Sequence, residues 1–344
     1  MPSRASAASS GSSADDVKAF VTGATGFVGS HLAAALVERG DTVVCLARRP
    51  EQAAFIASLG ALVAPGSLED GAALAAALRD VEVVYHVAGL TAAASEQEFL
   101  AVNEAGTRRL IEAAHRAVPH LQRFVYVSSI AAAGPAPRGG RLAEDAPCRP
   151  VTAYGRSKLA GEVVVRRSPA LPWTIVRPGV VYGPRDRELL RLFRIARLGV
   201  APVFGLGRQE VSIVHVEDLA DAIVRAALEP RALGQTYHVA HPTPVTQREL
   251  ALAVGRAARG GRAPLILPVP PLLAAPIVRA IGRAAAASGR RSVVDADKLA
   301  EFLAPSWAAS VEKAERELGW RASRDLTEGL AATAAWYRAE GWLS

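Results

Sequence analysis

The sequence predicts an α/β protein, with a doubly wound parallel sheet followed by a smaller, mostly helical C-terminal lobe. Apolar strands and amphipathic helices alternate from Lys18 to Val176, the pattern of parallel strands joined by crossover helices. A glycine-rich turn follows the first apolar run, where such sheets hold their ligands. The alternation is lost after Pro184, so the chain is expected to leave the sheet there.

The first strand and the turn behind it predict a Rossmann dinucleotide-binding site. An apolar run at residues 17–21 precedes the turn, and an amphipathic helix follows it and ends at Gly40. Gly23 permits a tight turn, Gly26 lets the backbone approach a phosphate, and Gly29 lets the helix pack against the strand. The free N–H groups and positive dipole end of that helix favour a pyrophosphate.

The second strand, residues 41–47, indicates which dinucleotide binds. An NAD-specific site usually ends this strand with a carboxylate that accepts a hydrogen bond from the ribose 2′-hydroxyl. Here Arg48 and Arg49 follow the strand, and a guanidinium matches a 2′-phosphate in charge and geometry. The sequence therefore favours NADP(H) over NAD(H), and the alternative is that one of these arginines is a solvated surface residue.

Tyr154 and Lys158 lie one helical turn apart, so their side chains share a helix face. An ammonium beside a phenol stabilises the phenolate and lowers the pKa of the tyrosine from about 10. The spacing thus predicts a tyrosine that exchanges protons near neutral pH.

Ordered motifs continue from the glycine turn to the C-terminus. They are residues 22–29, 66–70, 85–89, 102–107, 124–129, 177–184, 215–220, 317–320 and 336–337. Over residues 16–344 this set resembles the extended short-chain dehydrogenases/reductases, within the NAD-dependent epimerase/dehydratase superfamily. The subgroup it resembles holds dihydroflavonol reductase-like, cinnamoyl-CoA reductase-like and 3β-hydroxysteroid dehydrogenase-like enzymes. Ser67 stands where the family usually has an aspartate, so only Leu68 of that motif carries over.

The resemblance implies a role for each catalytic side chain. Ser129 would hydrogen-bond the substrate carbonyl, Tyr154 would give or take the proton, and Lys158 would hold the nicotinamide ribose. Asn103 would support a proton relay through water or act as a structural brace, and both alternatives stay open. The further residues expected around the cofactor are Thr25, Phe27, Val28, Leu68, Val87, Ala88, Gly89, Val127, Pro178, Gly179 and Val180. Those expected beside the substrate are Thr91, Ile130 and Tyr182.

Composition and charge restrict the remaining function classes. No cluster of histidine, cysteine and carboxylate side chains has metal-ligand spacing, and Cys45 and Cys148 suggest no disulfide framework. The net charge of +7 comes mainly from dispersed arginines without a basic module interleaved with aromatic residues, so no nucleic-acid partner is expected. Residues 1–16 are expected to form a disordered tail without a signal peptide, which predicts a cytoplasmic protein.

Two segments raise the question of a membrane. The apolar stretch 264–281 contains five prolines and Arg279, which argue against a membrane-spanning helix. Five arginines within residues 185–197 form either a basic face for an anionic substrate or membrane surface, or a solvated face of a packed helix. Interfacial membrane contact therefore stays open.

The predicted domain organisation is discontinuous. Residues 17–184 and 211–241 are expected to bind the cofactor, and residues 185–210 and 242–344 to form the substrate-binding lobe. A homodimer through the helices that begin near Glu96 and Thr152 is what the family resemblance implies.

The predicted substrate class follows from the absence of residues that are typical of sugar-nucleotide enzymes. Val211 and Ser212 stand where sugar-nucleotide epimerases carry an Arg-Asp pair whose arginine clamps the diphosphate, and Ile130 follows Ser129 where dehydratases have an acidic pair. These differences favour an oxidoreductase that reduces a ketone or aldehyde, or oxidises the alcohol, on a mostly apolar small molecule. The alternatives are a nucleotide-sugar epimerase that retains NAD, which an arginine of 185–197 facing the pocket would favour, and a non-catalytic dinucleotide sensor.

Overall fold

The computed structural model describes residues 17–270, 272, 276 and 296–343. The predicted N-terminal tail and part of the apolar stretch 264–281 lie outside these residues. Seven strands form one sheet in the order β11-β6-β5-β4-β1-β2-β3, and every neighbouring pair is parallel. The strands are β1 (Lys18–Thr22), β2 (Thr42–Ala47), β3 (Leu62–Pro65), β4 (Val83–His86), β5 (Arg123–Val127), β6 (Trp173–Pro178) and β11 (Gln235–Val239).

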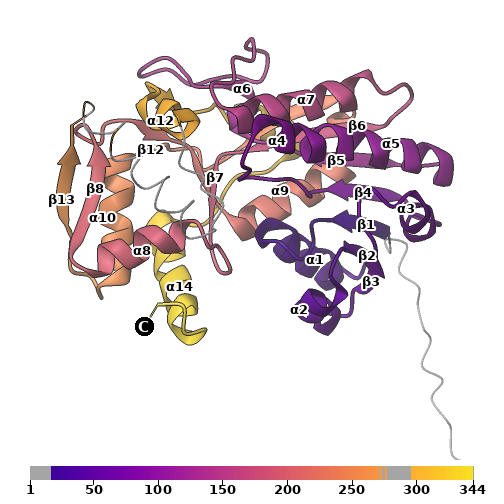
Figure 1. Ribbon diagram of the computed structural model, residues 1–344, viewed down its shortest axis with the longest axis horizontal. Coiled ribbons are helices and arrows are strands. Elements are labelled where there is room, and N and C mark those ends of the chain that lie inside the picture. Colours follow the sequence, from indigo (N-terminus) through magenta and orange to yellow (C-terminus); the bar gives the residue numbers. More distant parts are fainter. Residues whose placement is uncertain (1–16, 271, 273–275, 277–295, 344) are drawn as a thin grey trace, which may run out of the picture.

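Helices cover both faces of this sheet, as Figure 1 shows. One face carries α1 (Phe27–Arg39), α2 (Ala54–Ser58), α9 (Val216–Leu228) and α13 (Glu312–Leu318). The other carries α3 (Gly71–Ala77), α4 (Glu96–Asn103), α5 (Ala105–Ala117) and α7 (Ala153–Arg167). The predicted doubly wound Rossmann sheet is confirmed, and its strand order reverses between β1 and β4, where ligands bind in such sheets.

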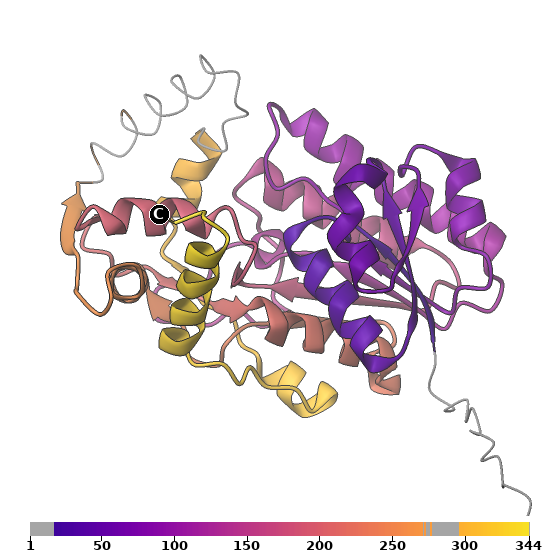
Figure 2. The same cartoon turned by 90° about the horizontal axis from the view of Figure 1, so that it is seen from below.

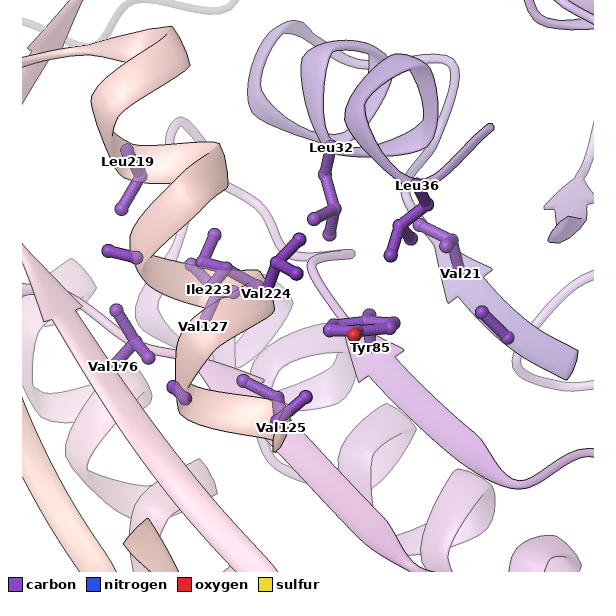
Figure 3. Packing of buried hydrophobic residues seen from close by; sticks show 14 of the residues in the cluster. Val21, Leu32, Leu36, Tyr85, Val125, Val127, Val176, Leu219, Ile223 and Val224 are labelled. Atoms are coloured by element: carbon purple, nitrogen blue, oxygen red, sulfur yellow. The ribbon is translucent and has the colours of Figure 1, made fainter. Parts of the chain in front are cut away.

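The core under α1 and α9 is made of aliphatic side chains from both helices and the strands beneath them. Leu32 and Leu36 of α1 and Ile223 of α9 point toward Tyr85 and Val125 of the sheet (Figure 3). All five side chains are at most 1% exposed. Because burial of each large apolar side chain contributes roughly 1.5–3 kcal/mol, this layer fixes α1 and its glycine turn against the strand ends.

The smaller lobe combines helices with short strand groups and lies beside the sheet (Figure 2). Its helices are α8 (Leu189–Arg197), α10 (Gln247–Ala258), α12 (Ala296–Leu303) and α14 (Leu326–Ala339). Its strand groups are β8 (Val200–Phe204) with β13 (Leu265–Val269), and β9 (Glu210–Val211) with β12 (Val245–Thr246) and β14 (Ser306–Trp307). Between the lobes, β7 (Val180–Tyr182) pairs with β10 (Ile213–His215).

The division between the lobes differs in detail from the one that the sequence suggests. Helix α13 and the residues after it, expected in the smaller lobe, pack on the sheet, because Leu318 and Trp320 join the core under α9. The indole of Trp320 also donates a hydrogen bond to the Asp218 carbonyl at 3.1 Å. The sequence predicts that residues 211–239 return to the sheet domain, but β11 is the only strand that they contribute to the seven-stranded sheet.

Candidate active site

The glycine turn between β1 and α1 leaves no room for side chains at its first and last glycines. A Cβ atom on Gly29 would lie 2.2 Å from the Gly23 carbonyl oxygen, and one on Gly23 would lie 2.7 Å from the Ala88 nitrogen. Gly23 also has a φ of 76°, which favours glycine. Helix α1 starts without a side-chain cap or an acidic residue in its first turn, so its N–H groups and positive dipole end fit a pyrophosphate.

Three of the predicted catalytic side chains meet between the carboxyl end of β5 and the start of α7. Thr152 caps α7 by accepting a hydrogen bond from the Gly155 N–H at 3.0 Å, and this fixes the turn that carries Tyr154. Ser129 faces the Tyr154 hydroxyl and favours its ionised form. The Lys158 ammonium donates to the Val127 carbonyl at 2.7 Å.

Burial dominates the electrostatics of the pair on α7. It raises the pKa of Tyr154 to about 12, although the hydrogen bond from Ser129 opposes the shift. Burial likewise lowers the pKa of Lys158 to about 7, and the Glu162 carboxylate opposes that change. The spacing predicts a depressed tyrosine pKa, but in this structure burial raises the pKa of Tyr154, and its hydroxyl is protonated at neutral pH.

Glu162 lies one turn beyond Lys158, fully buried, and ties three segments of the site together. Its carboxylate accepts from the Ser128 hydroxyl at 2.6 Å and from Nε and Nη2 of Arg177 at 2.8 and 2.7 Å. Ser128 precedes Ser129 at the end of β5, and Arg177 lies near the end of β6. One carboxylate thus holds α7, β5 and β6 in a fixed relative position.

The comparisons with known proteins agree with this geometry. The profile of the "NAD dependent epimerase/dehydratase family" matches residues 19–240. The chain belongs to this family. It is an enzyme of the extended short-chain dehydrogenase/reductase superfamily, an NAD(P)-dependent reductase or dehydrogenase.

Similar sequences include two reductases. The ceramide reductase of Caulobacter vibrioides is 34% identical over 328 residues, which cover 94% of this chain and 95% of the relative. A 4-hydroxy-2-methyl-3-oxo-4-farnesyl-3,4-dihydroquinoline-1-oxide ketoreductase of Stigmatella aurantiaca is 32% identical over 238 residues, which cover 67% of this chain and 70% of the relative.

Solved structures of similar proteins have the same fold over nearly the whole chain. The crystal structure of gox2253 is 28% identical with a TM-score of 0.79, covering 96% of this chain and 100% of that one. MoeE5 in complex with UDP-glucose and NAD is 27% identical with a TM-score of 0.73, covering 94% and 99%. The family therefore includes both reductases and proteins that bind sugar nucleotides.

A cleft of about 960 Å³ runs from the glycine turn to the catalytic side chains. It brings together most residues that the family resemblance implies. These are Gly23, Thr25, Gly26, Phe27, Val28, Gly29, Arg48, Leu68, Val87, Ala88, Gly89, Thr91, Val127, Ser129, Tyr154, Lys158, Pro178 and Gly179.

Five predicted residues do not line this cleft. Arg49 is exposed at the start of a 3-10 turn, and Val180 is 44% exposed on β7. Ile130 and Tyr182 are buried in the core of the smaller lobe, because both pack among its aliphatic and aromatic side chains. Asn103 is buried and acts as a brace in this structure.

The amide of Asn103 is fully engaged by its neighbours. Its oxygen accepts from the Leu90 N–H at 2.8 Å, while its nitrogen donates to the Leu90 carbonyl at 3.1 Å and to the Ser157 hydroxyl at 2.9 Å. The side chain thereby ties the loop after β4 to α7.

Side chains of the smaller lobe, which the sequence predicts to bind the substrate, line one end of the cleft. Arg185 and Arg187 line it together with aromatic residues from the C-terminus. The Arg185 guanidinium lies 3.8 Å from the centroid of Phe55, and that of Arg187 lies 4.6 Å from Trp342. The arginine-rich stretch was visible in the sequence, but only folding shows which arginines reach the cleft.

The part of the chain that the structure describes contains neither a candidate metal site nor a candidate membrane-spanning helix. Within it, no three histidine, cysteine or acidic side chains are grouped as metal ligands. Among the same residues, no helix combines the length and apolar character needed to cross a membrane.

Proposed function

We propose that the protein is an NADP(H)-dependent oxidoreductase that reduces a ketone or aldehyde on a mostly apolar, lipid-like molecule, or oxidises the corresponding alcohol. The observation that carries the proposal is the convergence of Ser129, Tyr154 and Lys158 beside the glycine turn in one cleft. The similarity to a ceramide reductase and to a ketoreductase with a farnesylated substrate supports the lipid-like class.

The chain's own residues supply the proton chemistry. A bound nicotinamide dinucleotide supplies or accepts the hydride. The Ser129 oxygen accepts from the Ala131 N–H at 3.1 Å, and its hydroxyl proton, which faces Tyr154 in this structure, would be donated to the carbonyl oxygen of a bound substrate. Tyr154, with a pKa of about 12, is a protonated general acid for reduction across the neutral range. Lys158, when protonated, stabilises the phenolate that proton transfer leaves behind.

The two positions at which sugar-nucleotide epimerases carry the Arg-Asp pair that binds the diphosphate support an apolar substrate for this chain. Val211 is 8% exposed and joins the core of the smaller lobe. Ser212 is 1% exposed, and its hydroxyl accepts from the Ala309 N–H at 3.0 Å. Neither position provides a charged group that could bind a diphosphate.

The finer features of this proposal concern the cofactor and the lobes. Arg48 lines the cleft after β2, which supports NADP(H), although NAD(H) is the ligand named for MoeE5. We propose that residues 17–184 and 211–241 bind the cofactor, while residues 185–210 and 242–344, apart from α13 and the residues after it that pack on the sheet, supply most of the substrate site. A homodimer through the α4 and α7 surface and a cytoplasmic location stay predictions.

The decisive test follows the absorbance of reduced nicotinamide with the purified protein. NADPH and NADH are each tested with long-chain ketones, sterol ketones and UDP-glucose. We expect consumption of NADPH with an apolar ketone and a loss of at least about 100-fold in kcat for Tyr154→Phe, with the Kd for NADPH nearly unchanged. Equal turnover by the variant would remove Tyr154 from its assigned role.

A second function has specific support. Arg185 and Arg187 line the cleft and could hold the diphosphate of a nucleotide sugar, so a sugar-nucleotide epimerase that retains NAD is the second candidate. Chromatographic conversion of UDP-glucose without net consumption of the cofactor would favour it over the oxidoreductase.

A further inference from the structure

The outer edge of the smaller lobe carries an apolar sheet face. Strands β8 and β13 pair in parallel and in register, so partners across the pair point to the same side. Both Figure 1 and Figure 2 place β13 at the outer edge of the molecule. The side that we call the β8–β13 face consists of Val200, Pro202, Phe204, Leu265, Leu267 and Val269.

Much of this surface is open to solvent. Leu265 is 64% exposed, Leu267 is 41% exposed, and Leu198, which precedes β8, is 78% exposed. At the other end, Phe204 packs on Phe302 of α12 with ring centroids 4.6 Å apart. Helix α8, which packs beside β8, also exposes apolar side chains, Leu192 and Ile195. Contiguous apolar surface of this kind usually marks an interaction site.

The segments that carry this surface are rich in positive charge. Residues 185–210 and 242–270 contain ten arginines and four acidic residues, a net charge of +6 within a chain whose total is +7. Arg191, Arg194 and Arg197 are exposed on α8, among its exposed aliphatic side chains. Apolar side chains interleaved with arginines are the composition of surfaces that lie in a lipid headgroup region.

We propose that the β8–β13 face and the exposed side of α8 dock on an anionic phospholipid bilayer. Self-association fits this surface less well, because a symmetric dimer through it would bring the exposed arginines of α8 in the two copies together. Helix α8 also links the surface to the cleft, since Arg187 and Glu188 line the cleft directly before the helix begins at Leu189. A lipid-like substrate would then reach the cleft from the membrane surface.

Vesicle flotation with the full-length protein tests the docking without measuring activity. Phosphatidylcholine vesicles are compared with vesicles of equal parts phosphatidylcholine and phosphatidylglycerol. We expect binding to the anionic vesicles that weakens with salt. The triple variant Arg191→Gln/Arg194→Gln/Arg197→Gln should lose on the order of 100-fold in partition coefficient, because each cation near an anionic surface contributes roughly fivefold.

A second pair of variants tests the apolar component. Leu265→Asp/Leu267→Asp should abolish flotation, whereas Leu233→Asp, at a leucine of 54% exposure elsewhere on the chain, should leave it unchanged. Circular dichroism and thermal unfolding establish that each variant is folded. The proposal is overturned if the folded wild type does not float, or if both sets of variants float like the wild type. It is also overturned if Leu265→Asp/Leu267→Asp instead converts an oligomer into a monomer in sedimentation velocity.

The vesicle result is independent of the proposed oxidoreductase activity. Binding without any turnover of apolar ketones would retain the docking surface and refute the proposed function, and turnover without binding would do the reverse.

Discussion

Replacement of Glu162 by glutamine should cost the protein much of its stability. The carboxylate is fully buried between Arg177, which is 1% exposed, and the Ser128 hydroxyl. Glutamine keeps the shape and one acceptor oxygen but removes the negative charge, so the buried Arg177 guanidinium loses its counter-ion and half of its two-point contact, and Arg166, 2.9 Å from the same carboxylate, loses its ion pair. An uncompensated buried charge costs about 3–5 kcal/mol, so we expect a loss of this size in the free energy of unfolding.

Urea unfolding, followed in parallel by tryptophan fluorescence and circular dichroism, measures this loss. The matched control is Glu96→Gln, because Glu96 forms an equally short two-point contact with Arg156 of the same helix α7. Both side chains of the control pair are more than 40% exposed, so its removal should cost less than about 1 kcal/mol. A loss for Glu162→Gln that is no larger than for Glu96→Gln would refute the reasoning.

The remaining predictions concern the glycine turn, cofactor choice and pH. Gly29→Ala should abolish dinucleotide binding measured by fluorescence titration, because its Cβ would lie 2.2 Å from a carbonyl oxygen; Gly71→Ala, with open space around its Cβ, should bind normally. Arg48→Ala should lower the affinity for NADPH at least about tenfold relative to the affinity for NADH. Arg49 lies outside the cleft, so Arg49→Ala should leave the ratio of the two affinities unchanged. The pKa of Lys158 is about 7 in the folded chain and 10.5 ordinarily, so between these two pH values the unfolded chain binds more protons than the folded chain. The free energy of unfolding should therefore rise with pH in this window. In urea titrations, Lys158→Met should abolish this rise.

The fold and the cofactor cleft could be predicted because their signals are local. Gly23, Gly26 and Gly29 occupy one turn, and Tyr154 and Lys158 occupy one helical turn, so spacing alone places each set. The strand and helix alternation fixes the doubly wound sheet for the same reason, since each element is encoded in its own short stretch of sequence.

What the sequence alone determined is therefore the sheet, the dinucleotide turn and the tyrosine–lysine pair. The tertiary structure decided which distant residues meet: Glu162 with Arg177, and the closing of the cleft by Arg187 and Trp342. It also determined the protonation of the pair, because burial is the largest cause of the pKa shift of both Tyr154 and Lys158. The physical reason is that pairing across the chain and desolvation depend on how the elements pack, and neither leaves a periodic signal in the sequence.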